Sequence, residues 1–318
     1  MSTTKELAIE ANGLVKRYGD DVLAVENVTL KVHKNTIHAL LGPNGAGKTT
    51  TISVLTTLIE PTAGSAMVAG FDVVSQAGEV RKRIGVTFQE MVLDDDLTGR
   101  QALDYHGQLY NLKAKQRQDK IVDLLGLVEL EEAADRKIKT YSGGMKRRLE
   151  LARGLMTSPE VLFLDEPTTG LDPQNRANLW DYIKNLKEQS GLTLLLTTHY
   201  MDEAETLADQ VSIIDHGHIV VEGTPRELID QMGADTIRIT GQGNNASYIE
   251  KVQSLPFVQA INSSDGLIQI GVDSGNKRLA EIVSLAQGEV FTIEDISLTK
   301  PSLDDVFIKH TGRQLRDI

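Results

Sequence analysis

The segment Gly42-Pro43-Asn44-Gly45-Ala46-Gly47-Lys48-Thr49 constrains the fold more than any other part of this 318-residue sequence. It fits the pattern G-x-x-x-x-G-K-[ST], with a strand-like apolar run at 36–41 before it and a predicted helix from about Lys48 after it. Glycines let backbone amides surround phosphate oxygens, and a helix N-terminus adds positive potential. We expect Lys48 to reach the β- and γ-phosphates of a nucleotide and Thr49 to bind Mg²⁺. The alternative is a glycine-rich turn that only caps a helix.

The first two-thirds of the chain alternate strand-like and helix-like segments, which predicts an α/β domain over residues 1–232. Further continuous apolar runs at 161–164 and 193–197 are typical of central parallel strands, because both faces of such strands are covered. Residues 99–158 have mainly helical patterns, so we expect a helical subdomain at about 90–160.

The pattern changes after Gly233, which predicts a second, accessory domain over 233–318. Its expected element order is β-α-β-β-α-β, the order of a ferredoxin-like α+β domain. The expected strands are 236–240, 257–262, 267–272 and 290–296, the helices are 247–255 and 277–286, and a turn is expected at 263–266. A last helix after Pro301 would place Leu303, Val306 and Phe307 on one apolar face. Regulation, dimer support and permease contact are all open as roles for this domain.

Composition excludes several classes of function. The sequence has no cysteine, so it has no disulfide, no thiolate zinc site and no cysteine nucleophile. Lys and Arg total 33 against 45 Asp and Glu, a formal net charge of −12 that disfavours free nucleic acid as the main partner. No secretory signal is visible, and no apolar stretch approaches the about 20 residues of a membrane-spanning helix. If the protein works at a membrane, we expect another chain to supply the span.

Two carboxylates end the strand predicted at 161–164. Asp165 is placed to hold Mg²⁺, directly or through water, and Glu166 can polarise a water for in-line attack on a γ-phosphate. Alone, the pair would indicate a strand end with a helix-capping acid. Beside a phosphate-binding loop, the catalytic interpretation is favoured.

The segment Ser142-Gly143-Gly144-Met145 precedes the basic run 146–148 and predicts a second anion-binding site at the start of a helix. Two phosphate-binding sites in a single nucleotide-binding domain make sense if the second binds a nucleotide held by another subunit. Here the sequence resembles the ATP-binding cassette (ABC) ATPases, in which Ser-Gly-Gly of one subunit closes over ATP bound to its partner. The alternative is a loop and a solvated basic helix. Met145 departs from the commonest signature, which has Gln.

The resemblance covers roughly residues 6–232 and implies roles for further positions. Tyr18 matches the aromatic side chain that stacks on adenine, with a strand-edge core tyrosine as the alternative. Gln89 matches the Q-loop glutamine that links Mg²⁺ to the transporter contact, and Asp172 in Gly170-Leu171-Asp172 matches the D-loop between subunits. His199 matches the switch histidine at the γ-phosphate, although a lone histidine is usually structural. The residues expected at ATP are Tyr18, Gly42, Pro43, Asn44, Gly45, Ala46, Gly47, Lys48, Thr49, Thr50, Gln89 and Asp165.

This likeness implies the catalytic set Lys48, Glu166 and His199, with Thr49, Gln89 and Asp165 at Mg²⁺. Three segments, 97–100, 141–145 and 301–307, further resemble daunorubicin-resistance-type export subunits. The narrower likeness implies a homodimer or heterodimer at the cytoplasmic face of the cell membrane. Such a dimer drives a separate transmembrane permease that exports a drug, lipid or polysaccharide. The rival is a soluble ABC ATPase acting on nucleic acid or ribosomes, and a small-molecule kinase or GTPase leaves the second anion site unexplained.

Overall fold

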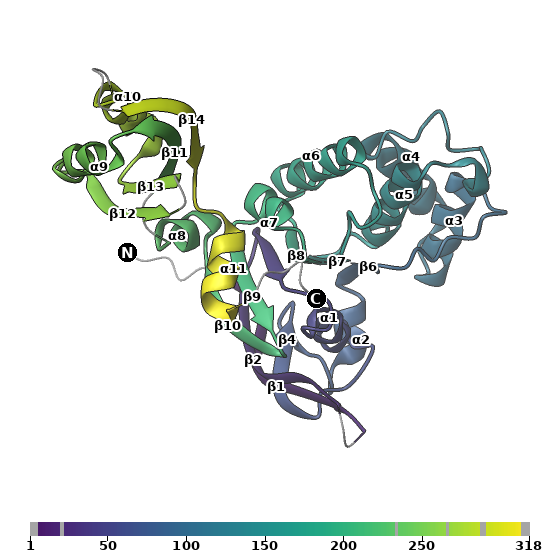
Figure 1. The fold of residues 1–318 in the computed structure, drawn as a ribbon. Helices are drawn as coiled ribbons and strands as arrows, with labels where there is room; N and C mark the ends of the chain where they lie inside the picture. Colours follow the sequence, from purple (N-terminus) through teal and green to yellow (C-terminus); the bar gives the residue numbers. More distant parts are fainter. Residues whose placement is uncertain (1–5, 20–21, 233–234, 265–266, 287–290, 313–318) are drawn as a thin grey trace. The chain divides into compact units, whose positions relative to one another are not determined.

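A computed structural model describes residues 6–19, 22–232, 235–264, 267–286 and 291–312 (Figure 1). The chain divides into two compact units. The first contains the chain up to Pro225, and the second begins at Arg226. The boundary predicted after Met232 lies just beyond this division, past the short helix α8 (Pro225–Asp230).

The first unit is built around a mainly parallel sheet. Its strand order is β10 (His218–Gly223), β9 (Gln210–Asp215), β3 (Ile37–Leu41), β8 (Thr193–Thr198), β7 (Val161–Asp165) and β6 (Ile84–Thr87). Only β10 pairs antiparallel, with β9. Every residue of β3, β7 and β8 is buried, as their continuous apolar sequences predicted.

An antiparallel sheet completes the main core of this unit. Its order is β2 (Val22–His33), β1 (Leu7–Tyr18), β4 (Ala63–Val68) and β5 (Phe71–Asp72). Side chains such as Ile9 and Leu30 from this sheet share one buried cluster with Leu40 and Phe163 of the parallel sheet. Helix α1 (Lys48–Leu55) adds Ile52 to the same cluster. This packing fixes the start of α1 against the carboxyl end of β3.

The expected helical subdomain is present between β6 and β7. It consists of α3 (Gly99–Leu109), α4 (Ala114–Leu127), the 3₁₀ turn η1 (Ile138–Thr140) and α5 (Gly143–Leu155), and the three α-helices lie together in Figure 1. The short helix α2 (Ala77–Arg81) precedes β6. Helix α3 begins at a capping box in which Thr98 and Gln101 exchange side-chain and backbone hydrogen bonds. Two further helices, α6 (Pro173–Ser190) and α7 (Met201–Leu207), follow β7 and β8.

The second unit has its own core. Its elements are β11 (Asp235–Gly243), α9 (Asn245–Gln253), β12 (Val258–Ser264), β13 (Leu267–Val272), α10 (Gly275–Ser284), β14 (Phe291–Thr299) and α11 (Leu303–Thr311). The sheet order is β12-β13-β11-β14 with antiparallel neighbours, and alternate residues such as Ile237 and Ile239 are buried. Tyr248 of α9 stacks on Phe291 with ring centroids 4.7 Å apart.

The order of these elements is the β-α-β-β-α-β order that the sequence predicted, while the ferredoxin-like assignment stays a prediction. Parts of two predicted elements, Asp265 and Gly266 of the turn and Val290 of the last strand, lie outside the described residues. The apolar face of α11 does have cover, because Leu303, Val306 and Phe307 are all buried.

Candidate nucleotide-binding site

The glycine-rich loop joins β3 to α1 where backbone segments approach too closely for a side chain. A Cβ atom on Gly42 would lie 2.2 Å from the carbonyl oxygen of Ile214, and one on Gly47 would lie 2.4 Å from that of Ala24. Gly47 also has φ of +102°, a left-handed conformation that glycine adopts without strain. The first amides of α1 have no acceptor within the helix, so they are available to an anion held in this loop.

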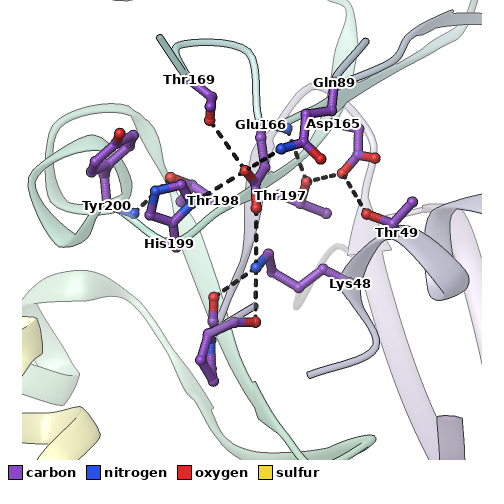
Figure 2. A network of polar contacts seen from close by, with 12 residues as sticks. Lys48, Thr49, Gln89, Asp165, Glu166, Thr169, Thr197, Thr198, His199 and Tyr200 are labelled. Carbon is purple, nitrogen blue, oxygen red and sulfur yellow. Dashed lines mark hydrogen bonds and ion pairs between the residues drawn. The ribbon is translucent and has the colours of Figure 1, made fainter. Parts of the chain in front are cut away.

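Lys48 is anchored at the floor of this loop and is only 4% exposed. Its Nζ donates to the carbonyl oxygens of Gly42 (2.8 Å) and Pro43 (3.0 Å) and lies 3.1 Å from Oε1 of Glu166 (Figure 2). Burial lowers the pKa of Lys48, and the Glu166 carboxylate opposes that shift. A phosphate entering the loop would therefore meet a desolvated lysine whose present counter-charge is the predicted catalytic glutamate.

Three oxygen-bearing side chains form a small cluster beside Lys48. Thr49 Oγ1 donates to Asp165 Oδ1 at 3.3 Å, and Thr197 Oγ1 donates to the same carboxylate oxygen at 2.5 Å (Figure 2). Hydroxyl and carboxylate oxygens are the donors that Mg²⁺ prefers, and this ion usually takes only one or two carboxylates besides water and substrate phosphates. Thr49 and Asp165 fit that donor set.

Glu166 occupies the centre of the polar network. Its φ is +47°, a conformation that costs a non-glycine residue roughly 1–2 kcal/mol, and its amide donates both to the carbonyl oxygen and to the side chain of Thr197. Burial raises its pKa, but neighbouring His199 and Lys48 outweigh burial and lower the pKa of Glu166 to about 2. The carboxylate is therefore ionised at neutral pH, as a group that orients water requires.

Gln89 and His199 approach the same carboxylate oxygen from different segments. Gln89 Nε2 donates to Glu166 Oε2 at 3.2 Å, and Nδ1 of His199 lies 3.2 Å from that oxygen (Figure 2). Thr169 Oγ1 also donates to Oε2, at 3.1 Å. Residues predicted separately from four parts of the sequence thus meet at one point, beyond the carboxyl ends of β3, β7 and β8.

Tyr18 is not part of this network among the described contacts. It ends β1, it is 45% exposed, and Lys16 Nζ lies 5.4 Å from its ring centroid. The alternative of a core tyrosine is therefore wrong. Its adenine-stacking role stays a prediction.

Ser142 and Gly143 are exposed, while Gly144 is buried. Ser142 is the N-cap of α5 and accepts a hydrogen bond from Met145 N at 3.2 Å. Gly144 is buried against Asn175, whose Oδ1 would lie 2.7 Å from a Cβ at this position. Asp172 caps α6 by accepting from Asn175 N at 3.0 Å. The signature serine and its first glycine are thus open to another molecule, while the D-loop aspartate has a local structural task.

Sequence reasoning missed several residues of the site. Thr197 holds both Asp165 and Glu166, but it lies inside an apolar strand and carries no motif signal. Arg147 is 5% exposed, so the alternative in which the run 146–148 is simply a solvated basic helix does not describe it. Arg147 and Arg148 are each three or four residues from buried Gly144 and buried Leu151, so helical spacing alone does not single out Arg147.

A separate cavity of about 1050 Å³ lies at the other ends of the strands, next to Val161 and Thr193, the first residues of β7 and β8. It contacts α4 and touches no member of the polar network. The chemistry of the site therefore belongs at the carboxyl ends of the strands and not in this cavity.

The sheet, the glycine-rich loop and the polar network together define a P-loop ATPase. Residues 25–169 match the family described as ABC transporter, and residues 223–311 match the family described as ATP-binding protein DrrA1-3-like, C-terminal domain. The chain is 43% identical to daunorubicin resistance ATP-binding protein DrrA3 of Streptomyces coeruleorubidus over 98% of both chains. It is 40% identical to Nod factor export ATP-binding protein I of Burkholderia thailandensis, over 97% of this chain and 98% of that one.

The chain also matches solved structures. One, described as an ATP-binding subunit of an ABC transporter, is 28% identical with a TM-score of 0.63, over 70% of this chain and 92% of that one. The chain belongs to the family of ABC transporter ATP-binding proteins and is an ATPase subunit of that family. This confirms the resemblance on which the predicted site was based.

Proposed function

We propose that two ATPase subunits of this type close over ATP and Mg²⁺ and drive a separate membrane permease that exports a drug, lipid or polysaccharide. The observation that carries the proposal is the meeting of Lys48, Gln89 and His199 at the carboxylate of Glu166. Support for export comes from relatives across nearly the whole chain, which are named for daunorubicin resistance and for Nod factor export.

In this proposal Lys48 and the loop amides bind the β- and γ-phosphates, and Tyr18 stacks on the adenine. Glu166 orients a water and accepts its proton, and His199 holds the γ-phosphate. As an ionised carboxylate, Glu166 can accept a hydrogen bond from that water. Thr49 and Asp165, with Gln89 beside them, would hold Mg²⁺, which when bound neutralises phosphate charge.

The second subunit would contribute the exposed Ser142 and Gly143, with Gly144 and Met145 behind them. These residues stand at the N-terminus of a 13-residue helix, where partial positive charge favours phosphate. Among the described contacts, the Ser142 side chain bonds only within its own helix turn and not to the polar network, so a partner's nucleotide is the proposed ligand of these residues.

The permease contact is proposed for the helical subdomain next to Gln89. Apolar side chains are exposed there, with Met91 46% and Val92 65% exposed just after Gln89, and Leu109 79% exposed at the end of α3. Among the described residues no helix is long and apolar enough to cross a membrane. A separate permease would supply the span and hold the ATPase at the cytoplasmic face of the membrane.

Transport into inside-out membrane vesicles tests the proposal. The vesicles would contain this subunit and a candidate polytopic permease, with daunorubicin as the fluorescent probe. We expect uptake that needs MgATP and fails with the Glu166→Gln subunit. ATP hydrolysis without uptake of daunorubicin, a lipid or a polysaccharide would refute export while leaving the ATPase assignment intact.

A further inference from the structure

Arg147 is a buried cation whose partners are almost all backbone carbonyls. It is 5% exposed and lies in the second turn of α5, the helix that begins at Ser142. Its Nε donates to the carbonyl oxygen of Pro167 at 2.6 Å, and its Nη2 donates to that of Glu166 at 2.6 Å. Its Nη1 donates to the carbonyl oxygens of Phe88 at 2.8 Å and Gln89 at 3.3 Å.

These bonds join three segments that are distant in sequence. One is the loop with Gln89, one is the strand end with Glu166, and the third is the signature helix itself. A planar guanidinium has five N–H donors in a fixed fork, so it can hold several carbonyls at set positions at once. No carboxylate forms an ion pair with Arg147 among the described residues, so those carbonyl dipoles solvate its charge.

The bond to Glu166 is notable because the backbone of Glu166 is strained, with φ of +47°. Thr197 holds the amide side of this residue, and Arg147 holds its carbonyl side. Strained backbone persists only where its surroundings over-determine it. The side chain of Glu166 reaches Lys48 and Gln89 from this conformation.

We propose that Arg147 is a positioning residue for ATP hydrolysis, which links the signature helix to the backbones of Gln89 and Glu166 in the same chain. The inference rests on the proposed function. In the proposed dimer, α5 contacts the partner's nucleotide, while Gln89 and Glu166 act on the chain's own nucleotide. Through Arg147, movement of α5 on one nucleotide is transmitted to the residues that hydrolyse the other.

The test compares Arg147→Lys and Arg147→Met with Arg148→Met in the complete transporter. Arg148 is the matched control because it lies on the same helix and donates to Val128 O (2.9 Å) and Tyr182 Oη (3.0 Å), not to any motif segment. Steady-state ATPase kinetics, ATP binding and thermal denaturation would be measured for each variant. Lysine keeps the charge but lacks the fork, so Arg147→Lys remains informative if Arg147→Met fails to fold.

We expect Arg147→Lys to lower kcat at least about 10-fold, since misplacement by about 1 Å can cost about 100-fold, with ATP affinity within about threefold of wild type. Arg148→Met should keep kcat within about twofold, even at equal loss of thermal stability. Combining Arg147→Lys with Gln89→Ala should lower kcat by less than the product of the two single effects, because both act on one loop.

Unchanged kcat in Arg147→Lys, or effects that multiply in the double variant, would overturn the inference. A parallel loss of kcat and thermal stability in Arg147→Lys and Arg148→Met would also overturn it. Absence of ATPase activity in the wild type and in Arg148→Met would instead show failure of the proposed function.

Discussion

Glu166 contacts four side chains of the site, and each contact has a consequence for hydrolysis. Lys48 and His199 keep it ionised, while Gln89 and Thr169 fix the orientation of its carboxylate. A general base contributes about 10²–10⁴-fold to a rate when it is held in place. The effect of removing it can therefore be separated from effects on ATP binding.

Glu166→Gln should bind ATP normally, lose at least about 100-fold in kcat and accumulate an ATP-bound dimer, because the amide cannot accept the proton of the water. Steady-state ATPase assays and size-exclusion chromatography with MgATP measure these outcomes. The matched control is Glu188→Gln, an exposed position on α6. Near-normal turnover of Glu166→Gln in the presence of its permease would rule out the role.

Lys48→Ala and Tyr18→Ala should fail differently. Lys48→Ala removes the buried counter-charge of Glu166 and the phosphate ligand, so productive ATP binding should be lost. Tyr18→Ala should weaken ATP affinity by about 1–3 kcal/mol, by analogy with base–aromatic stacking in nucleic-acid complexes. Titration with ATP measures both, with Tyr105→Ala on α3 as an exposed-tyrosine control. Equal ATP affinity in wild type and Tyr18→Ala would leave Tyr18 without an adenine role.

The site residues that sequence reasoning found are those in motifs of fixed local spacing, such as Lys48 and Thr49. Thr197 could not be found, because its partner Asp165 is 32 residues away in sequence and the register of β7 against β8 brings them together. Side chains chosen by tertiary packing leave no periodic signal in one sequence.

At the scale of elements, the sequence predicted that helices α9 and α10 exist, but it did not predict the residues at which they begin. Helix α9 begins at Asn245 and not at the predicted Ser247, because Asn244 caps it by accepting from Ser247 N at 3.1 Å. Helix α10 begins at Gly275 and not at Lys277. The amide of Gly275 donates to Asp235 at 2.7 Å, a residue 40 positions earlier on β11. A local cap and a long-range partner each moved a helix start by two residues.

Three adjacent acidic residues, Asp94, Asp95 and Asp96, follow Gln89 in the helical subdomain. Asp95 is 2.7 Å from Lys146 of α5, and Asp96 lies 3.4 Å from Lys139. These ion pairs within the chain favour an internal role over a contact with the permease.

Asp95→Lys should therefore reduce transport-coupled ATPase activity, and the exchange Asp95→Lys with Lys146→Asp should restore it. Each exposed ion pair contributes at most about 1 kcal/mol, so thermal stability should change little. ATPase assays with the permease present measure the recovery, and Asp119→Lys on α4 is a control on the same subdomain. A charge exchange that fails to restore coupling would indicate that the permease contacts Asp95 directly.

At the scale of the whole molecule, each unit has its own hydrophobic cluster, and every residue of the nucleotide site lies in the first unit. The second unit carries the sequence of the DrrA1-3-like C-terminal family over 223–311. We therefore expect ATP binding to depend on the first unit alone.

A chain shortened to residues 1–232 should thus still bind ATP, but dimerise or couple to transport less well. Titration with ATP and analytical ultracentrifugation with MgATP measure the two properties. The full-length chain with Leu303→Ala, which truncates one buried side chain of α11, is the companion variant. A folded 1–232 chain that no longer bound ATP would show that the two units form one functional body.

The pairing of Lys48 with Glu166 also implies that ATP binding is accompanied by proton exchange with the buffer. A phosphate that takes over Lys48 removes a cation from beside Glu166 and adds negative charge beside Lys48, so both pKa values rise. Glu166 should therefore take up protons when ATP binds, and more of them as the pH falls from about 7 to about 5, toward the pKa of a carboxylate. The γ-phosphate also exchanges protons in this range, so calorimetric titrations in buffers with different ionisation enthalpies would compare the wild type with Glu166→Gln. An equal number of protons in the two proteins would contradict the prediction.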